Sequence, residues 1–410
     1  MRGFPKTAYL MALTLASVAP HAKAEGIDRK AVVSRHNPVT YVSSEKSPAQ
    51  VGNGRFAFGA DITGLQTFRS FNTMSDWGWH SKPLPEGVSV EDYKPVVLTT
   101  WGKSVPYILN NPDCPEISDW LRENPHRINL GRIGFVLLKT DGTRAEERDL
   151  SDTRQETDLW TGIVSSGFTL EGVPVSVRTA CHPTMDMISI HVESPLVKSG
   201  RIGLFVDLPY SDGQSMLKLV GDYASPEKHK SALSSRGAGS GVITHVLDDT
   251  EYEIDLQWKG AAELYRVSEA AHEYRWSPSG GDGFDITFQF RPLNIPGMDI
   301  YEPSAEAGDV EKASAESWEK YWMSGAAVDL SGSSDPRWKE LERRIVLSQF
   351  VLRLNETGLF PPQESGLVNN GWYGRFHWEM IWWHGAHFLL WNRPNCVDGY
   401  LSKYAEFMEE

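Results

Sequence analysis

A two-residue alternation of apolar and polar side chains limits the fold of this chain more than any other feature of its sequence. Residues 188–193 read ISIHVE and residues 286–290 read ITFQF, so every second side chain is apolar. This period predicts strands with one buried face. Asp141-Gly142 and Glu171-Gly172 lie between such runs and predict hairpin turns. About a dozen such segments between residues 40 and 292 predict a large antiparallel β-supersandwich rather than a parallel α/β sheet.

The pattern changes to helical spacing after Pro292. Residues 305–322 are rich in Ala and Glu and predict a linker helix. Asp335 and Pro336 supply an N-cap and a first-turn proline for a second helix, which ends before Gly358. A Trp- and His-rich helix then runs up to residue 393. The last amphipathic stretch has one apolar stripe, at Val397, Leu401, Tyr404 and Met408.

These elements divide the chain into two domains. We expect a β-sandwich at 25–300 with an aromatic insertion at 71–130, a helical linker at 301–334 and a helical domain at 335–410. The Trp- and His-rich helix is apolar nearly all round and must be surrounded, which two amphipathic helices cannot do. We therefore expect this chain to be the front part of a longer protein.

The first 24 residues predict export. Arg2 and Lys6 give a basic start, residues 8–18 an apolar core, and Ala22-Lys23-Ala24 a cleavage site of the small-x-small type. No later segment has the ~20 apolar residues of a membrane span. The mature protein is expected in the periplasm or outside the cell. The net charge of −14 argues against a nucleic-acid partner, and three cysteines allow one disulfide at most.

Residues 371–391 contain the residues best suited to a ligand. Five of the fifteen tryptophans lie between Trp372 and Trp391, together with three histidines and a single carboxylate, Glu379. Aromatic faces take the C–H faces of a sugar ring, and a carboxylate accepts from its hydroxyls. On a helix Glu379 would lie over Trp383, partly desolvated and in need of partners. The alternative is an ion pair with Arg375 that only fixes the start of the helix.

Other chemistries have weaker support. His377, His384 and His387 lack the spacing of a metalloprotease signature, so we expect neither a metal nor any other cofactor. The sequence has no Gly-x-Ser-x-Gly elbow and no Walker-type loop. In the aromatic insertion, Trp77 or Trp79 is a candidate lid over a ligand. The alternative is a surface flap that covers a sheet edge.

The order of these parts resembles glycoside hydrolase family 65 and its six-hairpin relatives. The resemblance rests on VGNGRFAFG at 51–59, the helical linker, ESGL at 364–367 and GRFHWE at 374–379. It implies a β-supersandwich, a helical linker and the first helices of an (α/α)6 toroid. The family's Gly-His-x-Phe-Trp-Asp-x-Glu pattern holds the sugar. Gly374 and Trp378 match it, Glu379 stands at the aspartate position, and Arg375, His377 and Ile381 depart from it.

The resemblance implies a carbohydrate-active protein, with an inverting glycoside hydrolase of oligosaccharides as the main hypothesis. The general acid of the family would lie past Glu410, so the catalytic residues are not assigned. The expected substrate-binding residues are Arg375, His377, Trp378, Glu379, Trp372, Trp383, Trp77 and Trp79. A glycoside phosphorylase and a non-catalytic or inactive glycan-binding fragment remain alternatives. The acidic charge and the domain order argue against a polysaccharide lyase.

Overall fold

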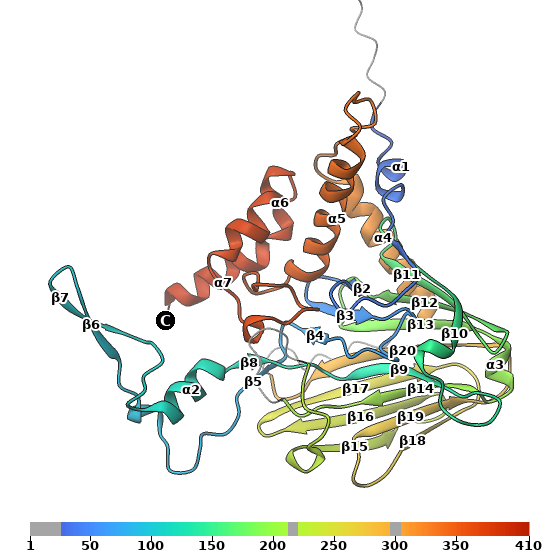
Figure 1. The fold of residues 1–410 in the computed structure, drawn as a ribbon, viewed down its shortest axis with the longest axis horizontal. Helices are drawn as coiled ribbons and strands as arrows, with labels where there is room; N and C mark the ends of the chain where they lie inside the picture. The colour runs from blue at the N-terminus through green and yellow to red at the C-terminus, as the bar shows by residue number, and fades with distance from the viewer. Residues whose placement is uncertain (1–25, 212–219, 296–304, 410) are drawn as a thin grey trace, which may run out of the picture.

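The computed structural model describes residues 26–211, 220–295 and 305–409, and the predicted signal peptide lies outside these ranges. A β-sandwich fills the lower part of the molecule in Figure 1, and most of the helices stand above it. The mixed β and α architecture predicted from the sequence is confirmed. The longer helices are α1 (Arg29–Ser34), α2 (Pro115–Glu123), α4 (Ala307–Met323), α5 (Trp338–Glu356) and α7 (Asp398–Glu409), with short helices α3 (Pro195–Lys198) and α6 (Ala386–Leu390).

The sandwich is built from antiparallel sheets. The largest has nine strands in the order β1 (Val39–Thr40), β10 (Leu150–Asp158), β11 (Ile163–Leu170), β12 (Val173–Cys181), β13 (Met187–Glu193), β20 (Gly283–Pro292), β17 (Thr250–Trp258), β16 (Ser240–Leu247) and β15 (Lys230–Ser235). Opposite lie β18 (Ala262–Arg266), β19 (Glu273–Pro278), β14 (Ile202–Asp207) and β9 (Arg132–Leu137), and a smaller sheet of β2 (Ala49–Gly52), β3 (Phe56–Ala60) and β4 (Thr73–Ser75).

The layers share one hydrophobic core. Phe56 of β3 and Phe290 of β20 approach to 5.3 Å between ring centroids, and Trp276 of β19 and Phe284 of β20 to 4.8 Å. These pairs join the smaller sheets to the nine-stranded sheet, so the predicted sandwich is observed. The predicted turn at Glu171-Gly172 is also observed, because both residues have positive φ (49° and 81°) between β11 and β12.

The linker helix α4 covers part of the outer face of the nine-stranded sheet. Val310 of α4 packs with Ala180 of β12 and Met187 of β13 in a separate small core. The alternation had predicted one buried face, yet Ser189 is as buried as its neighbours. Its burial follows from the cover that α4 provides, a tertiary contact that a period-two pattern does not encode.

The last turns of α5 pack against the glycine-rich run at 51–59. Gly54 has a φ of 92°, and its N–H donates to the carbonyl of Leu354 at 2.9 Å. A Cβ on Gly52 would lie 2.8 Å from a methyl group of Leu354. The run is therefore a tight strand entry, as expected, and it lets the last turns of α5 lie against the sandwich.

The chain between β4 and β9 leaves the sandwich as an arm, so the expected insertion at 71–130 is too wide at its start, where β4 belongs to the sandwich. Its base pairs β5 (Trp79–His80) with β8 (His126–Arg127), and its outer hairpin pairs β6 (Val96–Thr100) with β7 (Lys103–Tyr107). Figure 1 shows this hairpin projecting to the left, beyond α2. Trp101 at its tip is 98% exposed. The arm also contains the short helix α2, which begins with Pro115 in its first turn.

The Trp- and His-rich helix is only partly as predicted. Tyr373 and Gly374 have positive φ (60° and 64°), and Phe376 forms a bridge with Gln363. A helical run therefore begins only after Glu379, with a π-helical turn at Ile381–Gly385 followed by α6.

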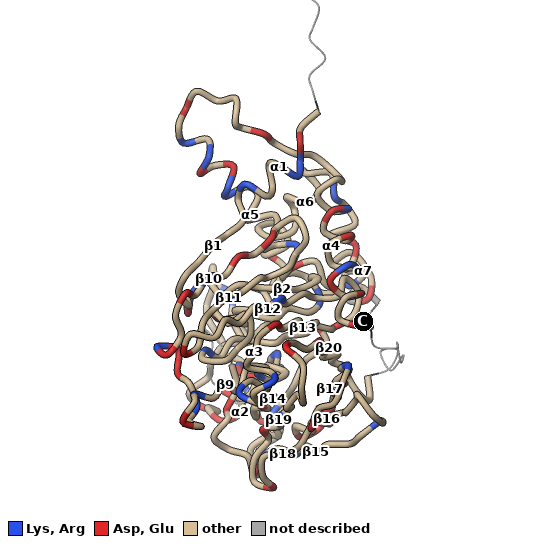
Figure 2. The backbone as a smooth tube through the Cα atoms, turned by 90° about the vertical axis from the view of Figure 1, so that its right-hand side faces the viewer, with Lys and Arg blue, Asp and Glu red and all other residues tan. Residues whose placement is uncertain are grey.

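Within the described residues, no helix is long and apolar enough to cross a membrane. Figure 2 shows the positions of basic and acidic residues interspersed along the backbone.

Candidate functional site

The base of the insertion meets the loop that follows α5. The guanidinium carbon of Arg127 lies 4.3 Å from the centre of the Trp79 ring, and Phe360 meets Trp79 edge-on at 6.0 Å. Burial lowers the pKa of Arg127 to about 10, against the charges of Asp76 and Glu356. Trp79 thus lies at the junction between the sandwich and the helical part. Its role in ligand binding stays a prediction.

Trp77 belongs to the sandwich core. It is buried, lies 6.0 Å from Tyr252 between ring centroids, and donates its indole N–H to Asp186 at 2.6 Å. The hypothesis that Trp77 acts as a lid is wrong, because its ring has no face toward solvent. The buried N–H needed an acceptor, and Asp186 supplies it.

Arg375 and His377 lie between the helical part and the insertion. Arg375 donates to the carbonyl of Pro125 at 2.8 Å and lies over the ring of Tyr373. The alternative for Glu379, an ion pair with Arg375, is not observed among the described residues. His377 meets Trp372 edge-on at 6.0 Å between ring centroids, and its Nε2 is buried with no partner among the described residues.

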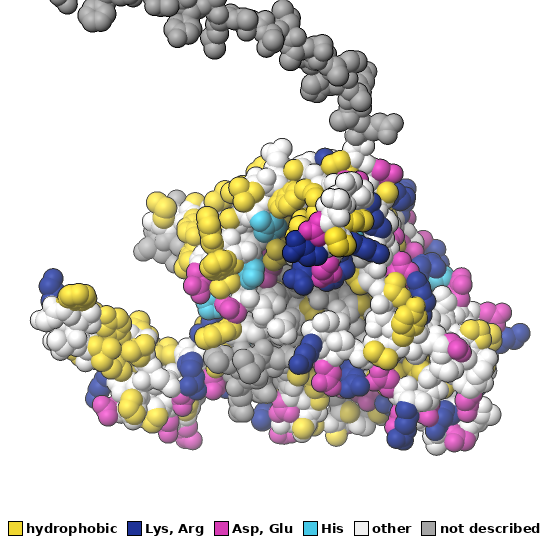
Figure 3. Space-filling model, turned by 45° about the horizontal axis from the view of Figure 1, so that its top comes forward, with side chains coloured by type: hydrophobic (Ala, Val, Ile, Leu, Met, Phe, Trp, Pro, Cys, Tyr) yellow, Lys and Arg dark blue, Asp and Glu magenta, His cyan; other side chains and the backbone are white. Residues whose placement is uncertain are grey.

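An aromatic face lies on the helical part. We define it by Trp372, Trp378, Trp382, Trp383 and Tyr404. Trp378 and Tyr404 are 43% and 39% exposed and lie 4.1 Å apart between ring centroids. Trp382 and Trp383 on the π-helical turn are 72% and 64% exposed. Figure 3 shows hydrophobic side chains gathered with histidines at the upper left, where Figure 1 places α6 and α7.

Glu379 is the only carboxylate within this stretch, and it points to solvent. It is exposed, and its side chain forms no hydrogen bond or ion pair with the described residues. The prediction of a partly desolvated carboxylate over Trp383 assumed a regular helix, which begins only after this residue. Glu379 is therefore available to a ligand, next to Trp378 in the sequence.

The site residue that the sequence did not reveal is Glu356, the last residue of α5. It is buried, and one oxygen accepts from the N–H of Gln363 at 3.2 Å. Burial raises the pKa of the Glu356 carboxyl well above its ordinary value, although the Gln363 N–H and the charge of Arg127 lower it. Buried carboxyls with raised pKa values are frequent in functional sites. The sequence RLNE at 353–356 reads as a solvated helix end, so no local signal marked this residue.

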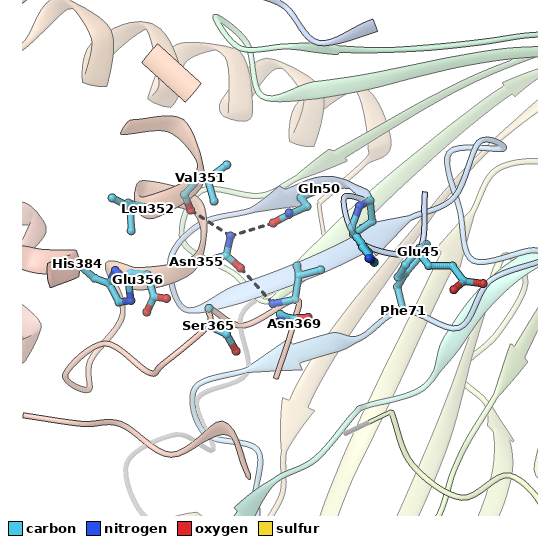
Figure 4. Close-up of a pocket in the computed structure, with 14 residues that line it drawn as sticks. Glu45, Gln50, Phe71, Val351, Leu352, Asn355, Glu356, Ser365, Asn369 and His384 are labelled. Atoms are coloured by element: carbon cyan, nitrogen blue, oxygen red, sulfur yellow. Dashed lines mark hydrogen bonds between the residues drawn. The ribbon is translucent and has the colours of Figure 1, made fainter. Parts of the chain in front are cut away.

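Glu356 lines a cavity of about 310 Å³ between α5 and the sandwich. Figure 4 shows Asn355 at its centre, with Gln50 and Asn369 on either side. Asn355 donates to Gln50 at 2.9 Å and accepts from the N–H of Val368 at 3.1 Å. His384 of the π-helical turn also lines the cavity, so the same segment contributes to the aromatic face and to this hollow.

The histidines are placed separately rather than around one point. His384 donates to the carbonyl of Glu364 at 3.2 Å, and His387 lies 4.1 Å from Phe388 between ring centroids. In the described ranges, no group of three or more His, Cys, Asp or Glu side chains is arranged to hold a metal ion.

Comparisons with known proteins gave matches in structure alone. No protein-family profile matches the chain. No curated protein matches it in sequence. The fold is similar to that of a proposed kojibiose phosphorylase from the human microbiome, with a TM-score of 0.49, 10% identity and coverage of 78% of this chain and 42% of that one. It is also similar to a bacterial glucoamylase determined with acarbose, with a TM-score of 0.36, 10% identity and coverage of 55% and 35%. The chain spans less than half the length of either protein.

Proposed function

We propose that this chain binds an oligosaccharide on its aromatic face. The exposed rings of Trp378, Trp382, Trp383 and Tyr404 carry the proposal, because large exposed apolar rings are frequent where a protein binds a ligand or another protein surface. Ring faces pack against the C–H faces of pyranoses. The solvated carboxylate of Glu379 adds a hydrogen-bond acceptor for sugar hydroxyls in the same segment.

The proposed activity of the whole protein is inverting hydrolysis of a glycosidic bond. Inversion needs a carboxylic acid and a carboxylate about 6.5–9.5 Å apart across the bond. Glu379 is offered as a sugar-binding carboxylate and not as the general acid. A phosphorylase is the alternative, in which phosphate replaces water as the attacking group. A non-catalytic glycan-binding protein is the second alternative.

Tryptophan fluorescence tests the binding site directly. Titration with maltooligosaccharides should quench the emission saturably, and Trp378→Ala should weaken the apparent affinity about tenfold, since a lost stacking contact costs about 1–3 kcal/mol. Trp101→Ala is the control, because Trp101 is also an exposed tryptophan (98%, against 43% for Trp378) but lies on the distant hairpin. Equal quenching curves for both variants would contradict the proposed site.

Glu379→Gln separates binding from catalysis. Affinity should fall while the melting temperature stays unchanged, because the carboxylate has no partner within the described residues. In any preparation that turns over oligosaccharide, the anomer released and the dependence on phosphate distinguish hydrolysis from phosphorolysis. Binding without turnover under both conditions would favour the non-catalytic alternative.

A further inference from the structure

The cavity at Glu356 is separate from the aromatic face. Its lining comes from α5, the loop at 365–369, the N-terminal segment at 45–50, Phe71 and His384, and it includes no tryptophan. Glu45 and Lys46 stand exposed at one side, and Glu45 pairs with Arg69 at 2.8 Å. The charged groups therefore lie at the mouth, while Asn355 and Glu356 form a buried inner wall.

Three groups in this cavity keep unused hydrogen-bonding capacity. Ser365 accepts from the N–H of Gly371 at 2.9 Å, which leaves its own hydroxyl proton to donate. His384 donates through Nε2 to a carbonyl, so Nδ1 is the acceptor of the neutral ring. Glu356 uses one oxygen for Gln363, and its other oxygen has no partner among the described residues.

Asn355 contributes rigidity instead. Its amide donates to Gln50 and to the carbonyl of Val351, and its oxygen accepts from Val368. With these bonds made, Asn355 holds α5 against the sandwich and fixes the position of Glu356 beside it. A rigid wall of this kind presents polar groups at set positions, which is a property of small-molecule sites.

The remaining lining is apolar. Phe71, Val351, Leu352 and Val368 face the same hollow. A ligand that combines C–H surface with hydroxyl groups satisfies both parts of the lining. The volume of about 310 Å³ lies at the lower end of the range for ligand pockets, about 300–1,000 Å³, and suits one ring rather than a chain.

We propose that this cavity is a second binding site, which takes a single uncharged pyranose whose hydroxyls bond to Glu356, Ser365 and His384. Glu356 acts in its protonated form, as a donor to a sugar oxygen. An acidic sugar would bring a charged carboxylate into a buried and partly apolar cavity, and removing that charge from water is unfavourable. Binding here is independent of the oligosaccharide proposed for the aromatic face.

Calorimetry with methyl α-D-glucopyranoside in the Trp378→Ala background tests this site alone. We expect one equivalent to bind without quenching tryptophan emission. Glu356→Gln keeps a donor and should bind within about threefold of the parent, whereas Glu356→Met should bind about tenfold more weakly. D-Glucuronate should bind about tenfold more weakly than the glucoside.

Asn369→Trp tests the cavity without changing any of the buried residues that line it. Asn369 is exposed and lines the cavity, so an indole at this position fills the hollow without disturbing α5. It should abolish glucoside binding and leave oligosaccharide quenching on the wild-type aromatic face intact. Two results would overturn the proposal for the cavity: no glucoside binding in the Trp378→Ala background, or glucoside binding that Asn369→Trp leaves unchanged. Neither result would contradict the proposal for the aromatic face.

Discussion

His126 makes the sandwich less stable in mild acid. The ring is fully buried on β8, where Nδ1–H donates to the carbonyl of Glu123 at 3.1 Å and Nε2 accepts from the Ser211 hydroxyl at 2.5 Å. Burial lowers the pKa of His126 to about 3, and the neighbouring charges of His80, Lys82 and Arg375 lower it further. The native state therefore holds the neutral ring well below pH 6.

The size of the effect follows from the difference between the two states. The unfolded ring titrates near pH ~6.5, so the unfolded chain binds more protons than the native protein between about pH 6.5 and 3. The stabilisation is fully present above this window and is lost as the pH falls through it. Between pH 7 and pH 5, His126 alone should cost about 2 kcal/mol of unfolding free energy.

Urea unfolding at pH 7, 6 and 5, followed by circular dichroism, measures this loss. His126→Gln removes the titration while keeping a donor and an acceptor, so its decline from pH 7 to pH 5 should be smaller than that of the wild type by about 2 kcal/mol. The other buried histidines are present in both proteins, so their contribution to the pH dependence of the unfolding free energy cancels in the comparison. Parallel declines, or an NMR titration of His126 near pH 6.5 in the folded protein, would refute the reasoning.

Four further variants test stability. Burial, followed by the charge of Asp76, raises the pKa of Asp186 to about 6, so the wild type should lose about 1.4 kcal/mol between pH 5 and 8 through this group, and Asp186→Asn should remove that loss in urea unfolding. Gly54→Ala should cost about 2 kcal/mol or more, because the residue has a φ of 92° and the new Cβ would lie 2.0 Å from a side-chain oxygen of Thr357. Gly142→Ala, at a similar φ with open space around it, should cost only about 1 kcal/mol in the same melts. Trp101→Ala should change the unfolding free energy by less than about 0.5 kcal/mol.

The sequence predicted the elements whose signals are local. Period-two alternation located strands such as β13 and β20. The helix α5 was also located, although its N-cap is Arg337 and not Asp335 as predicted. The turn at Glu171-Gly172 followed from the need for positive φ at both positions. In each case the determining physics acts within a few residues of the chain, so a reading of the sequence could find it.

The helix expected through 374–391 failed for a non-local reason. Its apolar and aromatic residues recur at spacings that suit a helix, but Phe376 pairs with Gln363, and the N–H of His377 donates to Pro362. These contacts to the loop after α5 hold the first part of the segment extended. A Cβ on Gly374 would lie 2.5 Å from Cβ of Arg127, so the close approach to the sandwich also restricts this backbone.

The two glutamates show why sequence reasoning located the aromatic site and missed the acidic one. Glu379 was chosen for its neighbours in the sequence, and its aromatic neighbours do lie on an exposed face. Glu356 lies between Asn355 and Thr357 at the end of a helix, with no cluster of aromatic rings beside it in the chain, but α5 buries it against the strands β2 and β3. Burial is what changes the chemistry of a carboxyl group, because desolvation disfavours its charged form. A carboxyl that serves as a proton donor is therefore expected where tertiary packing removes water, and an acceptor where solvent remains. Exchanging the two environments, rather than the two residues, would exchange their roles.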